Sequence, residues 1–275
     1  MSIAEEKNDA FNRLKELGRN KVILTRNVFF IPGWTSECCA AWREPYTKEN
    51  ISMREWAERL ISNWQGKVHF VTFTEAESKV CKNFLDFSSV LAEKVSPYLV
   101  EGTQVDLVGH SMGGLDISAG VINGVIPFKY VKNVITLGSP FHGAEWGGVM
   151  KTVSAASWFF PAIWAIVRIG LKKRYSYYHF LQLENMNPQG ETIRAFNKTE
   201  NRVKLLESVE KLYTFVGTDD DTVKQSAFFN NYAVPADLLG AKLNAICFDG
   251  ATHSGQLGLP QDPRVVLNIM RIISS

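Results

Sequence analysis

A serine flanked by small residues is the first feature of the sequence that could do chemistry. Gly109 and Gly113 lie two residues on either side of Ser111, in the pattern Gly-x-Ser-x-Gly. With the usual abundance of glycine and serine, chance produces this pattern in roughly one chain in ten of this length. Its surroundings strengthen it, because an apolar run (105–108) precedes it and helical spacing of apolar residues (112–126) follows it. Serine on a sharp strand-to-helix turn is typical of an exposed nucleophile, since glycines leave room for the turn.

A serine hydroxyl is a weak nucleophile at neutral pH and needs a base to accept its proton. On this type of turn the acid and then the histidine follow the serine along the chain. His253 is the only histidine after residue 179, and it follows the apolar run 241–248. We therefore expect His253 to be the general base. The remaining histidines are expected to be structural: His69, His110, His142 and His179.

An acidic side chain is needed to orient the imidazole and to stabilise its charged form. Asp219, Asp220 and Asp221 follow the apolar run 212–216 and precede the histidine in sequence. Adjacent aspartates usually form a solvated turn, but at the end of a strand one of them is better explained as this acid. Asp249 is the alternative.

Attack on a carbonyl places negative charge on its oxygen, which two backbone N–H groups would stabilise. Met112, directly after the serine at the start of the expected helix, is assigned one of these donors. The other is expected from Pro32-Gly33-Trp34, which follows the apolar run 28–31. Because proline has no backbone N–H, we assign the second donor to Trp34.

Short apolar runs alternate with amphipathic helical patterns along the chain. This alternation predicts an α/β protein with a mostly parallel central sheet flanked by helices, here as a single domain over residues 1–275. Residues 22–24 form a short apolar run. Strands are expected at 28–31, 68–73, 105–108, 131–137, 212–216 and 241–248, and helices at 4–18, 53–64, 84–98, 112–126 and 264–273.

An insertion at about 145–200 interrupts the alternation. Within it, residues 153–167 carry no charge and include Pro161. This run is too short for a membrane span, which needs about 20 apolar residues. We expect residues 150–175 to form a helical lid over the site rather than an ordinary core helix, and to contact a lipid interface. Its aromatic side chains, Trp158, Phe159, Phe160 and Trp164, indicate a substrate with a long apolar part.

The composition gives no sign of a cofactor, a metal ion or a nucleic-acid partner. The 275 residues carry a net charge of +2, which provides no strongly basic surface for nucleic acid. The first residues show no signal peptide, so a cytoplasmic location is expected, with export by a non-standard route left open. The four cysteines lack the spacing of a zinc site: Cys38, Cys39, Cys81 and Cys247.

Several blocks together resemble the α/β-hydrolase superfamily, and within it the lipase-like serine esterases, over residues 26–275. Residues 29–34 resemble the family's first strand and oxyanion loop, and residues 109–114 match the common lipase form of the serine turn. Residues 137–143 are similar to its L-G-T-P-H-x-G segment, and residues 183–197 resemble the stretch that follows many lipase lids.

A further block, residues 220–226, resembles the family's D-G-T-V-P-x-x-S segment, in which the first aspartate is the acid. The resemblance therefore selects Asp220 from the three candidates. The chain departs from the family at three points: Pro32 stands where histidine is usual, Asp221 where glycine is usual, and His142 is displaced by one position. No calcium-site motif can be carried over.

The resemblance implies an α/β-hydrolase fold and a serine carboxylic-ester hydrolase without a cofactor, acting on an apolar or lipid ester. Ser111 would be the nucleophile, His253 the general acid and base, and Asp220 the orienting acid. One alternative is an acyltransferase or thioesterase on the same triad, which product analysis with a competing alcohol would detect. The other is a non-catalytic binding module, which a fluorophosphonate would not label.

Overall fold

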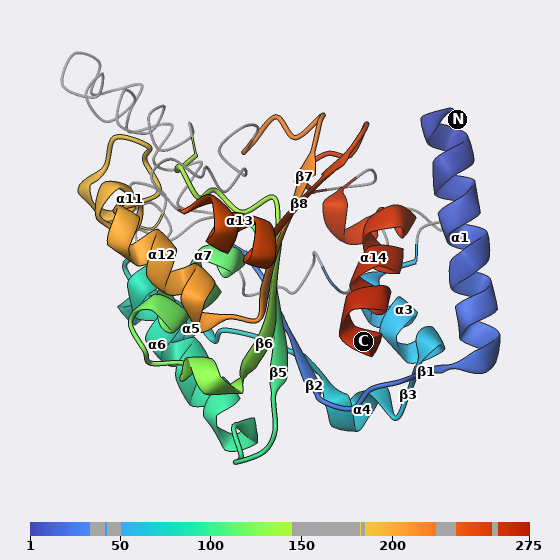
Figure 1. Cartoon of the computed structure of the whole chain (residues 1–275), viewed down its shortest axis with the longest axis horizontal. Helices are drawn as coiled ribbons and strands as arrows, with labels where there is room; N and C mark the ends of the chain where they lie inside the picture. The colour runs from blue at the N-terminus through green and yellow to red at the C-terminus, as the bar shows by residue number, and fades with distance from the viewer. Residues whose placement is uncertain (34–41, 43–50, 145–181, 183–184, 224–234, 255–257) are drawn as a thin grey trace.

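The centre of the protein is a sheet with parallel strands. The computed structural model describes residues 1–33, 42, 51–144, 182, 185–223, 235–254 and 258–275. Within these residues, six strands are hydrogen-bonded in the order β4-β2-β5-β6-β7-β8, and every pair is parallel (Figure 1). Their bounds are β2 Asn27–Ile31, β4 Val68–Phe70, β5 Val105–His110, β6 Val131–Leu137, β7 Lys211–Gly217 and β8 Leu243–Phe248.

Helices cover both faces of this sheet (Figure 1). One face carries α5 (Glu75–Val80), α6 (Phe84–Val95), α7 (Met112–Ile122), α11 (Glu191–Phe196), α12 (Thr199–Ser208) and α13 (Ala236–Lys242). The other face carries α1 (Ile3–Asn20), α3 (Met53–Leu60) and α14 (Pro263–Ser274). The prediction of a mostly parallel sheet with flanking helices is confirmed.

Strand β2 shows how one apolar run supplies two cores. Val28 and Phe30 belong to the cluster shared with α1, α3 and α14, whereas Phe29 and Ile31 belong to the cluster on the opposite face. Successive side chains of a strand point to opposite faces, and all four are buried. A continuous apolar run is therefore what a strand covered on both faces requires.

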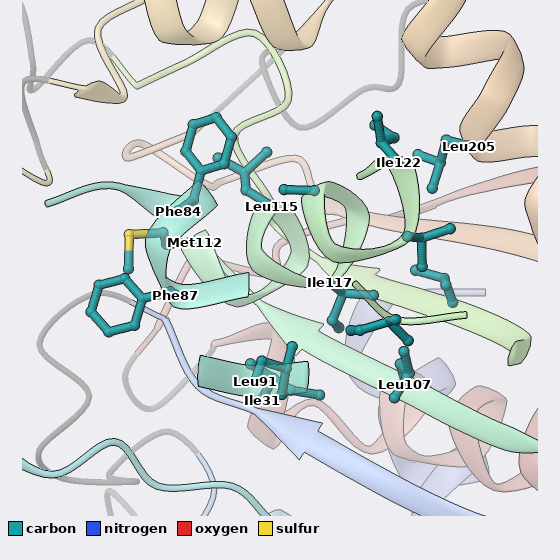
Figure 2. Packing of buried hydrophobic residues seen from close by; sticks show 14 of the residues in the cluster. Ile31, Phe84, Phe87, Leu91, Leu107, Met112, Leu115, Ile117, Ile122 and Leu205 are labelled. Carbon is teal, nitrogen blue, oxygen red and sulfur yellow. The ribbon is translucent and has the colours of Figure 1, made fainter. Parts of the chain in front are cut away.

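Helix α7, which follows Ser111, is buried along its whole length. Figure 2 shows Met112 and Leu115 of this helix in the same packed cluster as Phe84 and Phe87 of α6, and Ile117 near Leu107 of β5. Packing at this density resists displacement. The buried helix therefore holds the residue before it, Ser111, in a fixed position.

The expected helix over 53–64 is wrong at its end, because α3 stops at Leu60. The next two residues form β3 (Ile61–Ser62), which pairs in parallel with β1 (Val22–Ile23) in a separate small sheet. The start of α3 agrees with the sequence pattern, since Ser52 and Glu55 form a capping box. Long-range pairing thus overrides a helical pattern that continues to Trp64.

Other boundaries shift for local reasons. The helix expected over 84–98 ends at Val95 and continues as a 3₁₀ turn that contains Pro97, because proline cannot donate the next helical hydrogen bond. The helix expected over 112–126 ends at Ile122, shortly before Gly124 takes a left-handed φ of 72°. The strands expected over 68–73 and 241–248 are shorter, β4 and β8, and residues 241–242 belong to α13.

Several sequence predictions lie outside the described residues. They include Trp34, His179, Cys38 and Cys39, and the expected lid with Trp158, Phe159, Phe160 and Trp164. In the part of the chain that the structure covers, no helix combines the length and the apolar character needed to cross a membrane.

The strand order sets the place of a site. The chain runs from β2 outward to β4 and then crosses to β5 on the other side of β2. In open parallel sheets, ligands bind at the carboxyl ends of the strands near such a reversal. Ser111 directly follows β5, Asp220 follows β7 and His253 follows β8, so all three come to the same edge.

Candidate active site

Ser111, His253 and Asp220 form a hydrogen-bonded row at the carboxyl edge of the sheet. The Oγ atom of Ser111 lies 2.9 Å from Nε2 of His253, and Nδ1 of His253 lies 2.9 Å from Oδ2 of Asp220. An ionised carboxylate only accepts hydrogen bonds, so Nδ1 carries the hydrogen and Nε2 accepts from the serine hydroxyl. The ring is therefore oriented to take a proton from that hydroxyl.

The serine turn, residues 109–114, depends on missing side chains. A Cβ atom on Gly109 would lie 2.5 Å from the backbone nitrogen of Gly114. A Cβ atom on Gly113 would lie 2.5 Å from the carbonyl oxygen of Pro32 and 2.6 Å from that of Ile31. All three distances are shorter than Cβ contacts in real structures. Glycine at position 109 therefore lets the turn close on itself, and glycine at position 113 lets it pack against the end of β2.

Ser111 itself has an uncommon backbone. Its φ is 54° and its ψ is −128°, in a region that L-residues other than glycine rarely adopt, and such residues cost about 1–3 kcal/mol each. The N–H of Ser111 donates to the carbonyl of Leu137 at 2.8 Å, which helps to hold the turn. This conformation directs the side chain out of the end of β5, and Ser111 is partly exposed while the rest of α7 is buried.

Asp220 is the buried member of the three adjacent aspartates. Its Oδ1 accepts hydrogen bonds from the backbone N–H groups of Val223 (2.8 Å) and Thr222 (3.0 Å), and its Oδ2 faces His253. Burial alone would raise the pKa of Asp220, but the hydrogen bonds and charge of His253 and these two amides lower the pKa below its usual value. Asp219 and Asp221 are exposed, so Asp220 is the one of the three aspartates that is buried against His253.

His253 lies in a loop that follows β8, the histidine loop (residues 249–254 and 258–262). Its backbone is tied to the β7 side, because the N–H of Gly250 donates to Oγ1 of Thr218 at 2.8 Å. Within the loop, the N–H of Leu259 donates to the carbonyl of Thr252 at 2.9 Å. His253 is buried, with 8% of the residue exposed.

A second set of contacts links the histidine loop to α1 and α14. Arg264 donates to the carbonyl of Asp249 at 2.7 Å, to Oδ2 of Asp262 at 2.8 Å, and to Oε2 of Glu6 at 3.1 Å. A Cβ atom on Gly250 would lie 3.3 Å from the side chain of Ile3. The first turns of α1 therefore lie against the loop that carries His253.

One predicted oxyanion donor, Met112, is the first residue of α7. The first amides of a helix have no carbonyl within the helix to donate to, so the Met112 N–H, directly after Ser111, has no acceptor within α7. The other predicted donor, Trp34, is outside the described residues, but its neighbour Gly33 is close to the serine. A Cβ atom on Gly33 would lie 2.6 Å from Cβ of Ser111, so the backbone at Gly33 lies directly against the serine.

Sequence reasoning missed the place of Gly138, which follows β6 between the strands that carry Ser111 and Asp220. Its φ is 55°, and a Cβ atom here would lie 2.9 Å from Oδ2 of Asp220 and 3.0 Å from Nδ1 of His253. Gly138 thus leaves the room that the aspartate and the histidine need. A glycine directly after a buried strand at this edge was the available signal.

The other histidines differ in their relation to the site. His69 has Nε2 3.1 Å from Oδ1 of Asn27, and its ring stacks on Phe29, its partner in β2. His110, by contrast, contacts His253 directly: its Nε2 lies 2.8 Å from the carbonyl oxygen of His253. Among the described residues, no group of three or more His, Cys, Asp or Glu side chains is placed to hold a metal ion.

The fold is shared with solved structures of lipases and a phospholipase. Phospholipase PlaB from Legionella pneumophila superposes with a TM-score of 0.64 at 12% identity, over 91% of this chain and 60% of that chain. Lipase BlEst2 from Bacillus licheniformis, in its propeptide form, gives 0.56 at 17% identity, over 91% and 50%. Lipase B from Aspergillus fumigatus gives 0.53 at 15% identity, over 92% and 57%.

This chain therefore spans 50% to 60% of the length of these three proteins. Identities this low show a common fold. No family model matches this chain, and no curated protein matches its sequence.

Proposed function

Given that the chain has the α/β-hydrolase fold, we propose that it is a serine hydrolase of carboxylic esters. The observation that carries the proposal is the row of two hydrogen bonds on His253. Its Nε2 lies 2.9 Å from Oγ of Ser111, and its Nδ1 lies 2.9 Å from Oδ2 of Asp220. A base within about 2.6–3.2 Å of a serine hydroxyl, itself oriented by a third group, is the arrangement of an activated nucleophile.

In the first half of the proposed reaction, Oγ of Ser111 attacks the ester carbonyl carbon while Nε2 of His253 takes the hydroxyl proton. The tetrahedral intermediate collapses when the C–O bond to the alcohol breaks, and Nε2 returns the proton to the departing alcohol oxygen. The acyl group is then bonded to Ser111. Asp220 stabilises the imidazolium that forms between the two proton transfers.

In the second half, water takes the place of the alcohol. Nε2 of His253 accepts a proton from the water as its oxygen attacks the acyl carbon, and gives the proton to Oγ of Ser111 as the acid leaves. In both halves the carbonyl oxygen becomes negative, and the Met112 N–H at the start of α7 would donate to it, with Trp34 as the second donor. Such a donor contributes on the order of 10²–10³ in rate.

The proposed substrates are esters with an apolar acyl group. This part of the proposal rests on the sequence of the insertion, whose aromatic residues Trp158, Phe159, Phe160 and Trp164 offer surface for an acyl chain. The names of the solved lipases and the phospholipase agree with ester substrates. A lid formed by residues 150–175 would exclude water during the reaction.

The test is covalent labelling with a fluorophosphonate, which reacts only with an activated serine, followed by mass spectrometry of the labelled peptide. We expect the label on Ser111, and a loss of kcat on the order of 10⁶-fold in Ser111→Ala, as for removal of a nucleophilic serine elsewhere. Ser254→Ala is the matched control, because Ser254 is exposed beside His253 and should keep both label and activity.

The same preparation should be assayed on p-nitrophenyl esters of increasing chain length, with and without a competing alcohol. Higher kcat/KM for long chains supports the apolar acyl pocket, and the product ratio measures the partition between water and alcohol. Unlabelled wild-type protein, or a label on another serine, would overturn the proposed mechanism.

A further inference from the structure

His110, the residue before the serine, reaches across the site to the backbone of the histidine. Its Nε2 lies 2.8 Å from the carbonyl oxygen of His253, 143 residues away in sequence. A carbonyl oxygen only accepts hydrogen bonds, so Nε2 of His110 carries the hydrogen and donates it. One side chain on β5 therefore fixes the backbone position of the residue that supplies the base.

The two imidazole rings also pack on each other. Their centroids are 4.9 Å apart with an angle of 38° between the planes. The edge of the fully buried Trp42 packs against His110, with ring centroids 6.0 Å apart. His110 is thus held by packing from one side while it holds His253 on the other.

The charge state of His110 suits this role. Burial, and after it the positive charge of His253, lower the pKa of His110 to about 3, although the hydrogen bond to His253 and the charge of Asp220 act in the opposite direction. The ring is therefore neutral at neutral pH. The imidazolium that forms on His253 during turnover then faces Asp220 and an uncharged ring, and never a second cation.

Taking the proposed function as the premise, we propose that His110 is a positioning residue, whose Nε2–H···O=C bond to His253 sets the distance between the base and Oγ of Ser111. Ser111 and His110 are adjacent on one rigid strand end, so the bond ties the base to the same element that carries the nucleophile. Movement of the histidine loop relative to β5 would otherwise lengthen the 2.9 Å contact directly.

The deciding comparison is between His110→Phe, which keeps a ring but no donor, and His110→Gln, whose side-chain amide offers a donor at similar reach. We expect kcat, normalised by fluorophosphonate titration of reactive sites, to fall on the order of 10- to 100-fold in His110→Phe with KM little changed, because a displacement of about 1 Å can cost 10²-fold. His110→Gln should recover most of the loss. His69→Phe is the matched control, since His69 lies on β4 and contacts Asn27 and Phe29.

A second readout does not depend on turnover. The hydrogen on Nδ1 of His253, which is bonded to Asp220, should give a sharp downfield proton NMR signal in the wild type and in His110→Gln. It should broaden or move upfield in His110→Phe. A merely structural role for His110 would lower the unfolding temperature in both variants and leave the normalised kcat and this signal unchanged.

The outcomes separate the two proposals. A normalised kcat and an Nδ1 signal equal to wild type in His110→Phe would overturn the positioning role while the ester hydrolase stands. If the wild type neither labels nor hydrolyses esters, the proposed function fails, and the NMR comparison alone decides whether His110 positions His253. A loss in His69→Phe as large as in His110→Phe would also count against the inference.

Discussion

The serine turn and the histidine loop deliver the two reacting groups to the same edge by different means. The serine turn is fixed by backbone contacts that exist because Gly109 and Gly113 have no side chains. The histidine loop is fixed by side chains from elsewhere in the chain, among them His110, Arg264 and Thr218. Close backbone packing requires glycines at fixed positions in a short motif, which can be recognised in the sequence. Side-chain contacts between separate elements leave no such local pattern.

This difference explains which parts of the site can be read from sequence. The place of Ser111 is encoded within five residues and the apolar patterns beside them. His253 could be chosen because it is the only histidine after residue 179, and Asp220 because a family block resembles its surroundings. The contact from His110 to His253 could not be predicted, since it joins residues 143 positions apart.

Some features of the fold could likewise be predicted from the sequence, and others could not. Alternating apolar runs and helical patterns predicted the parallel sheet and its flanking helices, because burial on both faces demands such runs. The end of α3 at Leu60 was not predictable, because it depends on the pairing of Ile61 with Val22 from a distant strand. The extent of β8 depends likewise on where α13 ends.

Among the substitutions that test this comparison, Asp220→Asn is expected to give the largest effect. It acts on His253 and is measured as a loss of kcat. The amide would leave His253 without an acceptor for its Nδ1 hydrogen and favour the wrong tautomer, so kcat should fall about 10⁴-fold. Esterase assays on purified protein would measure it. Asp219→Asn and Asp221→Asn are matched controls, because both side chains are exposed in the same loop, and a comparable loss in either would contradict the assignment.

Gly113→Ala tests the packing of the serine turn. Its Cβ atom would lie 2.5 Å from the Pro32 carbonyl oxygen, and backbone cannot retreat as a flexible side chain would. The free energy of unfolding should fall by about 1–3 kcal/mol or more, as for overpacked cores. Urea unfolding followed by circular dichroism measures this loss.

The control for that change is Gly240→Ala in α13, where nothing lies within 4 Å of the added carbon. Alanine is favoured over glycine within a helix by about 1 kcal/mol, so this variant should be as stable as the wild type or more stable. Equal stability of Gly113→Ala and Gly240→Ala would show that the serine turn tolerates side chains, and the contrast between the two regions would fail.

Asp116→Asn is expected to change the pH dependence of stability, and it sharpens the comparison from within α7. Asp116 is fully buried, and its carboxyl oxygens have no hydrogen-bond partner in the described part of the chain. Burial raises the pKa of Asp116 well above its usual value, so the folded protein keeps a proton that the unfolded chain releases above about pH 4. Stability must therefore decrease as the pH rises from there towards the pKa in the folded state, by at most about 1.4 kcal/mol per pH unit.

Asparagine cannot titrate, so the variant should lose less stability between pH 5 and pH 8 than the wild type. Urea unfolding at both pH values measures the two slopes. Asp106, whose pKa burial raises to about 6, contributes a slope of the same sign to both proteins and cancels in the difference. Identical slopes would mean that Asp116 is ionised in the folded protein.

The contact between Glu6 of α1 and Arg264 of α14 spans 258 positions of sequence, and this separation bears on the order of events during synthesis. A growing chain has Ser111 and its strands long before it has His253, while α1 gains its contacts with α14 only after that helix has been made. The proposed catalytic row would then be complete only after the segment that carries His253 has been made. A ribosome-bound intermediate would have the serine turn but no histidine to activate Ser111. The apolar side of α1 around Leu14 would stay exposed until α14 emerges, and chaperones would be needed to shield it.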